Sequence, residues 1–272
     1  MLDTSYYLQI FIIGICIGSF LNVVVYRFQE NLSIIKPRSF CPKCNTQLTW
    51  RENIPFISWF IQGGKCKTCK TTISFRYPLI ELLTGFLFII FLNSSPSLYA
   101  SSSNLFLNTL FSWVFLSLLV CISFIDIDNL WIPQGLVNFG FITGCLGLIF
   151  LSIFGNEFFD FVFLFKGLTT SLISFFIFEI FRRFAKFIFK KDAIGKGDSK
   201  LVAMIALWLG PIGTLFAIGF SYVFAATYCF AGLSMNYLRF RQVIPFAPFI
   251  SLGGLTVWFL GNEFIMLKIL GI

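Results

Sequence analysis

The feature that most constrains this chain is a series of long apolar runs. They lie at roughly 6–26, 78–93, 105–125, 132–154, 158–181, 200–217, 218–238 and 246–270. A helix needs about 20 mainly apolar residues to cross the hydrocarbon core of a bilayer. Only 12% of the 272 residues are charged, whereas a soluble domain of this size needs far more polar surface. We therefore predict an all-α polytopic membrane protein with about eight transmembrane helices.

Two of these runs have special features. Gly210-Pro211 interrupts the sixth run, which favours either a half-helix or a tight re-entrant pair at that point. The first run lacks the basic start and the small-residue cleavage site of a secretory signal. We therefore expect it to remain as a membrane helix.

Basic residues are concentrated in three segments. Nine Lys or Arg lie within 27–76, seven within 182–200 and two within 239–241. With eight spans, all three segments fall on one side of the membrane, which the positive-inside rule makes the cytoplasmic side. This distribution accounts for the net charge of +8 without a nucleic acid partner. We expect contact with the lipid bilayer and no nucleic acid binding.

Four cysteines form two Cys-x-x-Cys pairs after the first run. They are Cys41, Cys44, Cys66 and Cys69. Two such pairs at this spacing can close a tetrahedral shell around Zn²⁺ that leaves no position for water, so the metal would be structural. A cytoplasmic location disfavours disulfides. A redox pair is the alternative, although neither motif opens the strand–helix unit that carries one.

These patterns predict three parts of the chain. Residues 1–26 form a first transmembrane helix, and residues 27–77 form a cytoplasmic, zinc-ribbon-like module. Residues 78–272 form a transmembrane domain. In a loop this short, a bound metal supplies the stability that a small apolar core cannot.

The absence of histidine narrows the possible chemistry. It excludes Ser-His-Asp and Cys-His nucleophiles and every His-based metal centre. Asp126 ends the third apolar run and Asp198 opens the sixth, so the topology brings both carboxylates to the cytoplasmic face at similar depth. Two carboxylates that share a site hold a single proton, which supplies the acid and the base that amide hydrolysis needs.

The motif "GKGD" places two glycines beside the second aspartate. Gly195 and Gly197 allow backbone angles closed to other residues and let an extended substrate approach the carboxylate. A plain helix cap is the alternative interpretation of this tetrapeptide. Lys200, Asp128 and Glu81 are further candidates to bind substrate or shape the site, and Glu81 lies inside an apolar run without a local partner.

Several blocks of the sequence resemble the bacterial prepilin peptidase family. They are "GSFLNVVVYR", "SFCPKCNTQLTWRENIPFISW", "GGKCKTCKTTISFRYPLIELLTG", "IDIDNLWIP", "GKGDSKLVAMIALWLG" and "IPFAPFISLGG", in the family's order and over nearly the whole chain. The resemblance implies that Asp126 and Asp198 are the catalytic aspartates of a GxGD-type intramembrane protease. Asp126 is preferred to Asp128 because the family's first aspartate lies seven residues before the proline, here Pro133. The resemblance also implies that the four cysteines bind zinc.

The resemblance has further implications for substrate and donor. The family removes the short basic leader of prepilins and pseudopilins, after a glycine, at the cytoplasmic face of the bacterial inner membrane. It then methylates the new N-terminal residue, usually Phe, with S-adenosylmethionine. No Rossmann-type glycine fingerprint marks a donor site here. Two departures from the family are Gln134, where many relatives carry an acid, and Ala247, where many carry glycine.

Two alternatives remain. One is a peptidase that lacks methylation or acts on other signal sequences. The other is a non-enzymatic transporter or scaffold with a zinc-ribbon docking loop, in which the aspartates form an ion pathway or cap helices. A transporter would be expected to show polar residues near mid-membrane and an internal repeat, and neither is evident.

Overall fold

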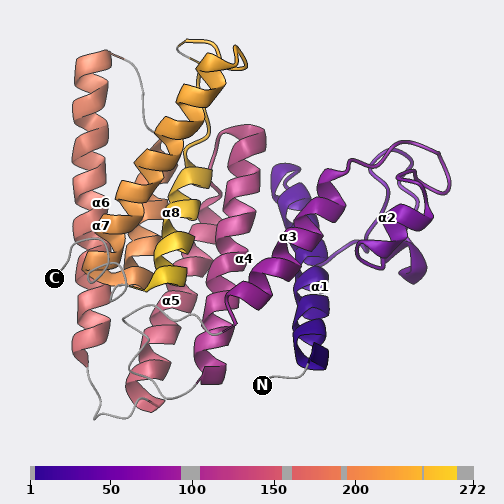
Figure 1. The fold of residues 1–272 in the computed structure, drawn as a ribbon, viewed down its shortest axis with the longest axis horizontal. Coiled ribbons are helices and arrows are strands. Elements are labelled where there is room, and N and C mark those ends of the chain that lie inside the picture. The colour runs from indigo at the N-terminus through magenta and orange to yellow at the C-terminus, as the bar shows by residue number, and fades with distance from the viewer. Residues whose placement is uncertain (1–3, 93–104, 155–160, 191–194, 241, 262–272) are drawn as a thin grey trace. The chain divides into compact units, whose positions relative to one another are not determined.

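The computed structural model describes residues 4–92, 105–154, 161–190, 195–240 and 242–261 (Figure 1). The helices are α1 (Thr4–Gln29), η1 (Trp50–Asn53), α2 (Ile57–Ile61), α3 (Arg76–Ile90), α4 (Leu105–Asn129), α5 (Gln134–Phe154), α6 (Phe161–Phe189), α7 (Lys196–Ser234) and α8 (Ala247–Leu260). Of the helices described, α1, α4, α6 and α7 are long and apolar enough to cross a membrane, while α5 and α8 provide shorter apolar stretches. The all-helical membrane fold is therefore confirmed. The count of eight spans stays a prediction.

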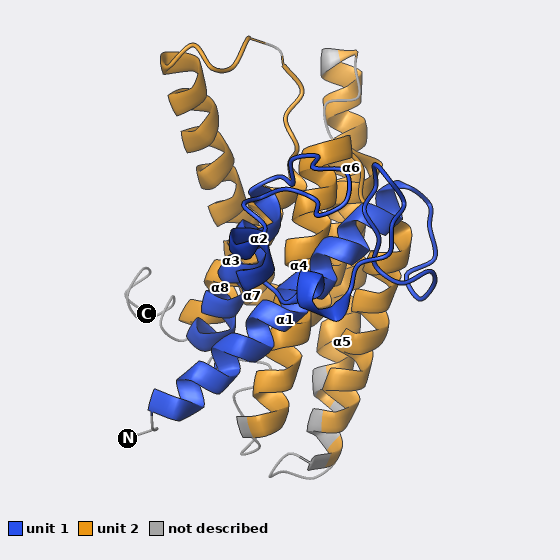
Figure 2. Ribbon diagram, turned by 90° about the vertical axis from the view of Figure 1, so that its right-hand side faces the viewer, with its two compact units in different colours: residues 1–92 blue, residues 93–272 orange. Residues whose placement is uncertain are grey.

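The chain divides into two compact units, residues 1–92 and 93–272 (Figure 2). The first unit holds α1, the cysteine module and α3, and the second holds α4 to α8. Helix α3 packs against α1. The expected boundary at residue 78 therefore falls inside the first unit, and the division lies after α3.

Glycines allow the close contact between α1 and α3. A Cβ atom on Gly14 would lie 2.7 Å from the Cα of Gly85, and one on Gly18 would lie 2.8 Å from the Cα of Glu81. Small residues at a spacing of four are a common means of bringing membrane helices together. This contact fixes the backbone of Glu81 against the first helix.

The first half of α7 forms the centre of the second unit. All residues from 201 to 210 are buried, as expected for a helix that is apolar on every side. The indole N–H of Trp208 donates to the carbonyl of Gly140 in α5 at 3.0 Å, and the hydroxyl of Ser171 in α6 donates to the carbonyl of Ala203 at 2.8 Å. The start of α7, which carries the GKGD motif, is thus held inside the bundle.

Helix α7 is broken at Gly210, whose φ of 71° and ψ of −175° are not helical. On a straight helix Asp198 and Tyr222 would be about 36 Å apart, yet Tyr222 lies within electrostatic reach of Asp198. The chain therefore turns back at this break and forms a pair of helices. The interruption predicted at Gly210-Pro211 is confirmed, and of its two forms the structure has the pair of helices. The boundary placed at residue 217 is wrong, because the second half of α7 runs through that position without interruption.

We expect Gly210→Ala to destabilise the protein by about 1–3 kcal/mol, because these backbone angles are open essentially to glycine alone. Thermal unfolding in detergent measures the effect. Gly219→Ala is the matched control, since Gly219 lies in the second half of α7 with open space around its Cα. Equal melting temperatures for the two variants would contradict the role of Gly210 in the turn.

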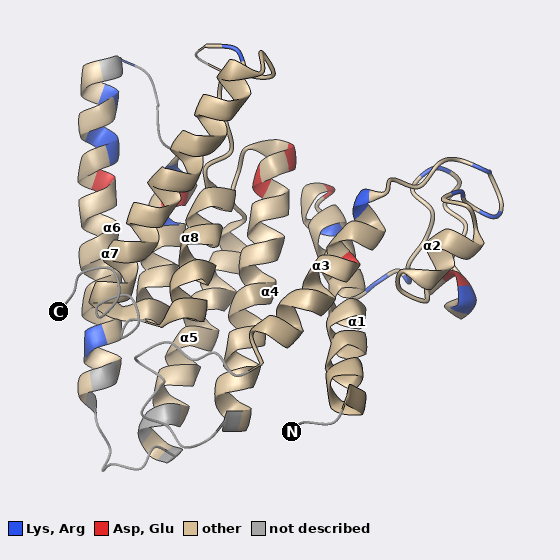
Figure 3. Cartoon of the chain, in the orientation of Figure 1, with Lys and Arg blue, Asp and Glu red and all other residues tan. Residues whose placement is uncertain are grey.

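Basic side chains gather at one end of the second unit. The Lys and Arg residues of the C-terminal half of α6 and of the α7–α8 loop lie toward the end at which α4 finishes (Figure 3). In α6, Glu179 pairs with Arg182 at 2.6 Å and with Arg183 at 3.1 Å. The two candidate aspartates are therefore at the basic end of the bundle.

Candidate active site and metal centre

Asp126 lies in the last turn of α4 and is buried, with 5% of its surface exposed. Its Oδ2 accepts a hydrogen bond from the backbone N–H of Ala247 at 3.0 Å, and the N–H of Phe246 also donates to the carboxylate. These groups open α8, and the N-terminus of a helix favours negative charge. The start of α8 therefore orients Asp126.

Asp198 lies in the first turn of α7 and is also buried, with 6% of its surface exposed. Its Oδ2 accepts the backbone N–H of Gly195 at 3.0 Å, which is the capping interaction that a plain helix start would make. Asp126 lies within electrostatic reach of Asp198. A helix cap and a shared carboxylate site are therefore compatible at this position.

The two glycines of the motif provide space rather than unusual backbone angles. Gly195 has a φ of −68° and a ψ of 147°, which any residue can adopt, and Gly197 has no positive φ. The expectation that they supply angles closed to other residues is wrong. A Cβ on Gly197 would lie 2.8 Å from the Cβ of Ile132, and one on Gly195 would lie 3.1 Å from Oδ2 of Asp198. The glycines therefore leave room for these neighbours.

Two other candidates of the second unit lie on its surface. Asp128 is exposed in the last turn of α4, and a spacing of two residues places it on a different face of the helix from Asp126. Lys200 is exposed, and its Nζ donates to Oε1 of Gln134 at the start of α5. Lys200 thus links the beginnings of α7 and α5.

Tyr222 lies near both aspartates and was missed by reasoning from sequence. Its ring centroid is 5.5 Å from that of Phe246, the residue before Ala247, and it is within electrostatic reach of Asp198. The turn at Gly210 brings it there. The Gly-Pro pair was the only signal that could have pointed to it, because the residues around Tyr222 carry no polar pattern.

The four cysteines form one cluster in the first unit. Their Sγ atoms all lie within 4.8 Å of one another, and the sulfur atoms of Cys41 and Cys69 are 3.8 Å apart. Tetrahedral thiolate ligands at a Zn–S distance of about 2.3 Å are about 3.8 Å apart. The predicted four-cysteine cluster is therefore confirmed, and its donor set fits Zn²⁺.

The two Cys-x-x-Cys pairs have the same backbone design. A residue with positive φ follows each pair, Asn45 at 56° and Lys70 at 58°, and a threonine comes next. The carbonyls of Thr46 and Thr71 accept the N–H of the first cysteine of their own pair at 3.0 and 2.9 Å. The cysteine spacing alone did not predict this turn, although the sequence carries its signal as a threonine two residues after each pair.

The same threonines also contact the outer cysteines. The Oγ1 of Thr46 lies 3.3 Å from the Sγ of Cys44, and that of Thr71 lies 3.2 Å from the Sγ of Cys69. These hydrogen bonds lower the pKa of Cys44 and bring the pKa of Cys69 to about 6. Burial raises the pKa of the Cys41 thiol to about 11. The thiolate is therefore favoured at the two outer cysteines, and a bound cation would favour deprotonation of Cys41.

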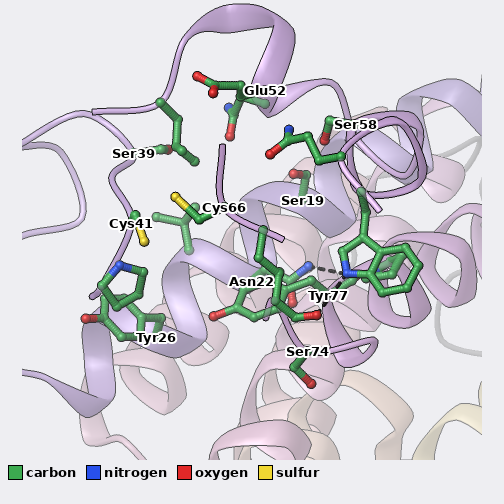
Figure 4. Close-up of a pocket in the computed structure, with 18 of the residues that line it drawn as sticks. Ser19, Asn22, Tyr26, Ser39, Cys41, Glu52, Ser58, Cys66, Ser74 and Tyr77 are labelled. Carbon is green, nitrogen blue, oxygen red and sulfur yellow. Dashed lines mark hydrogen bonds between the residues drawn. The ribbon is translucent and has the colours of Figure 1, made fainter. Parts of the chain in front are cut away.

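A cavity of about 450 Å³ lies beside the cluster, within the first unit (Figure 4). Cys41 and Cys66 border it, and Tyr26, Trp59 and Tyr77 contribute aromatic walls. Its volume is typical of a small-molecule site.

One wall of the cavity depends on a glycine. Gly64 has a φ of 64°, and a Cβ there would lie 2.8 Å from the Trp59 ring. The indole N–H of Trp59 donates to the carbonyl of Ile73 at 3.1 Å. The wall is therefore held in a fixed position.

Glu81 is a buried acid that faces this cavity, with 7% of its surface exposed. Its Oε2 accepts the backbone N–H of Phe56 at 2.6 Å, and the hydroxyl of Ser19 also donates to the carboxylate. Glu81 thus belongs to the first unit, whereas Asp126 and Asp198 belong to the second.

Two family profiles match the chain. The Bacterial Peptidase A24 N-terminal domain matches residues 12–94, and the Type IV leader peptidase family matches residues 113–230. The first match covers most of the first unit, and the second match lies within the second unit. No solved structure matches the chain.

Three similar proteins illustrate the relationship. The "Type 4 prepilin-like proteins leader peptide-processing enzyme" of Escherichia coli O78:H11 (strain H10407 / ETEC) is 31% identical, over 91% of each chain. The "Prepilin leader peptidase/N-methyltransferase" of Bacillus subtilis (strain 168) is 32% identical, over 94% of this chain and 95% of the relative. A protein of the same name from Myxococcus xanthus (strain DK1622) is 37% identical over 74% of this chain, which spans 55% of that relative's length.

Proposed function

Because this chain belongs to the bacterial type IV prepilin leader peptidase family, we propose that it is a membrane-embedded aspartic endopeptidase and N-methyltransferase. It removes the leader of prepilins or pseudopilins after a glycine and methylates the new N-terminal residue. The family profiles and the similar proteins confirm the resemblance that the sequence motifs indicated. The observation that carries the peptidase role is the pair of buried carboxylates, Asp126 and Asp198, at one end of the second unit.

The two aspartates perform hydrolysis as an acid and a base. The ionised carboxylate takes a proton from water as the water oxygen attacks the scissile carbonyl, and the protonated one donates to the carbonyl oxygen. The C–N bond then breaks as the leaving nitrogen receives a proton. The N–H groups at the start of α8 orient Asp126, and Gly195 orients Asp198.

The experiment that tests this proposal is intact-mass analysis of a prepilin-type substrate co-expressed with the protein. Loss of the leader mass supports the peptidase, and the mass of the product also reports methylation. If several correctly inserted substrates all keep their leaders, the transporter or scaffold alternative is favoured.

The protein is a multi-pass membrane protein, and we place it in the bacterial inner membrane with the aspartates and the cysteine module at the cytoplasmic face. The basic residues at the aspartate end of the second unit support this orientation, since Lys and Arg remain in the cytoplasm. A leader junction that lies at this membrane surface can reach the aspartates.

The first unit supplies the metal site and a place for the methyl donor. The four cysteines would hold Zn²⁺ in a structural role. The aromatic walls of the cavity suit an adenine ring or a sulfonium, and Glu81 supplies a negative charge, so these residues fit S-adenosylmethionine. Tyr26, Trp59 and Tyr77 would hold the donor, and Glu81 lies on the same cavity. The donor supplies an electrophilic methyl group for the amine that cleavage releases.

Tyr222 lies within electrostatic reach of Asp198, and its hydroxyl would stabilise the charge on the aspartates if it donated to them during the reaction. We therefore expect Tyr222→Phe to lower the rate of leader cleavage by about tenfold or more, since a hydrogen bond to a charged group contributes about 1.5–3 kcal/mol. The measurement is the initial rate of cleavage in detergent. Tyr228→Phe is the matched control, because Tyr228 packs on Phe249 at 5.4 Å between the same two helices. Equal rates in both variants would show that Tyr222 does not assist the aspartates.

A further inference from the structure

The cavity of the first unit contains a buried carboxylate that leader cleavage does not use. We propose that Glu81 binds the ammonium group of a ligand that occupies this cavity. The inference rests on the proposed methyl transfer, because both participants in that reaction carry an ammonium group. One is the amino-acid part of the donor, and the other is the new N-terminus of the cleaved peptide.

The first support is that Glu81 has only uncharged partners. Among the described residues, its carboxylate receives hydrogen bonds from the N–H of Phe56 and the hydroxyl of Ser19. A buried carboxylate is costly unless it is paired with a cation. An ionised carboxylate has more lone-pair positions than these two donors fill. A ligand cation would complete its surroundings.

The second support is that other charged groups bordering the cavity serve the fold. The guanidinium of Arg27 donates to the backbone carbonyls of Ser33 and Ile34 at 2.7 and 2.8 Å, and also to that of Pro37. It therefore holds the chain that leaves α1.

The other acid of the lining has a structural task as well. Glu52 accepts the N–H and the hydroxyl of Thr49 at 2.8 and 2.7 Å, which caps η1. Lys43 lies within the first Cys-x-x-Cys motif, between Cys41 and Cys44. Glu81 is thus the acid suited to a ligand.

The third support is a strained turn that fixes Glu81. Phe56 has a φ of 60° and a ψ of −55°, and the N–H of Ile57 donates to the carbonyl of Pro55 at 2.6 Å. This three-residue turn is rare for a residue other than glycine. Strain of this kind persists where the surroundings impose it, and it is concentrated at ligand sites. Glu81 binds the N–H at the centre of the turn, so the carboxylate is held rigidly at the cavity wall.

The test is calorimetric binding of S-adenosylmethionine to the full-length protein in detergent, with Glu81→Gln as the variant. The amide keeps an oxygen for the Phe56 N–H but loses the charge. S-adenosylhomocysteine and methylthioadenosine are the companion ligands. The first keeps the ammonium group without the sulfonium charge, and the second keeps the nucleoside but has neither charge. Glu30→Gln is the matched control, since Glu30 is exposed just after α1 and does not border the cavity.

If Glu81 binds the donor's ammonium, Glu81→Gln weakens the binding of S-adenosylmethionine and of S-adenosylhomocysteine by about tenfold or more and leaves methylthioadenosine binding unchanged. A loss confined to S-adenosylmethionine would assign Glu81 to the sulfonium and overturn the proposal. If it binds the peptide N-terminus, donor affinity is retained and the KM of the acceptor peptide rises by about tenfold. Donor affinity and acceptor KM that both stay within about threefold of native would overturn the proposal. Glu81 would then only support the turn at Phe56.

Leader cleavage and bound zinc are measured in the same preparations to separate this inference from the proposed function. A native protein that binds donor and methylates, with a Glu81→Gln variant that does so equally well, contradicts this inference alone. A native protein that cleaves but neither binds donor nor methylates contradicts the methyl transfer, and with it this proposal. A native protein that also fails to cleave contradicts the proposed function as a whole.

A measurement on the native protein covers the case in which Glu81→Gln does not fold. Carbodiimide labelling of carboxyl groups, mapped by mass spectrometry, reports whether Glu81 is reachable. We expect saturating S-adenosylmethionine or a Phe-started peptide to protect Glu81, whereas methylthioadenosine does not. Equal labelling in the presence of every ligand would overturn the proposal.

Discussion

Asp198→Asn and Asp126→Asn each lower the rate of leader cleavage by at least about 10³-fold, while the protein stays folded in the membrane. Asparagine keeps the shape of the side chain and an oxygen that can accept the N–H of Gly195 or Ala247. It cannot exchange a proton with water or with the substrate carbonyl. The measurement is the initial cleavage rate of a purified prepilin-type substrate, beside the melting temperature of each variant.

The double variant distinguishes a shared site from two independent ones. Residues that act as a unit are strongly non-additive, so Asp126→Asn combined with Asp198→Asn is expected to be little worse than either alone. Asp128→Asn provides the comparison within the same helix end, where we expect less than about a tenfold change because this side chain is exposed. A loss in Asp128→Asn as large as in Asp126→Asn would contradict the assignment of the first aspartate.

Removal of the metal from the cysteine cluster has the second large expected effect, which is unfolding of the cysteine module. Structural zinc contributes about 10–16 kcal/mol of binding energy to small domains, and this module otherwise contains only η1, α2 and two isolated bridges. Because Cys41 and Cys66 border the cavity, methyl transfer is lost with it. Cleavage persists, since both aspartates lie in the second unit.

The experiment compares Cys66→Ser with Cys16→Ser, a lone cysteine in α1 outside the cluster. Bound zinc is measured by elemental analysis, and cleavage and methylation are read separately from product masses. We expect Cys66→Ser to lose zinc and methylation, and Cys16→Ser to keep both. Native methylation in a zinc-free Cys66→Ser protein would show that the metal does not support the cavity.

The cysteine cluster and the placement of the aspartates were accessible from sequence because their signals are local or topological. A Cys-x-x-Cys turn directs two sulfur atoms to one point whatever surrounds it. The prediction that Asp126 and Asp198 share one membrane face rests on counting apolar runs and basic loops, which small errors in helix ends do not disturb. These features therefore needed no knowledge of packing.

Features that depend on packing could not be predicted in the same way. Hydropathy does not change where α7 turns. The Gly210-Pro211 pair indicated a break, but the boundary between the two apolar runs was still placed after residue 217. The proximity of Tyr222 to Asp198 depends on that turn, so it could not be predicted without the position of the turn. The interpretation of Gly197 failed for a related reason, because its neighbour Ile132 is distant in sequence and only the folded chain shows that space is needed.

The contact between α8 and Asp126 has a consequence for how this sequence can diverge. The groups that hold the carboxylate are main-chain N–H groups, which every amino acid except proline possesses. A substitution at position 247 by any residue other than proline therefore keeps the N–H group that holds Asp126. The constraint that remains at this position is side-chain volume, since Ala247 is fully buried. Most changes of side chain in the segment that opens α8 therefore leave the hydrogen bonds to Asp126 in place.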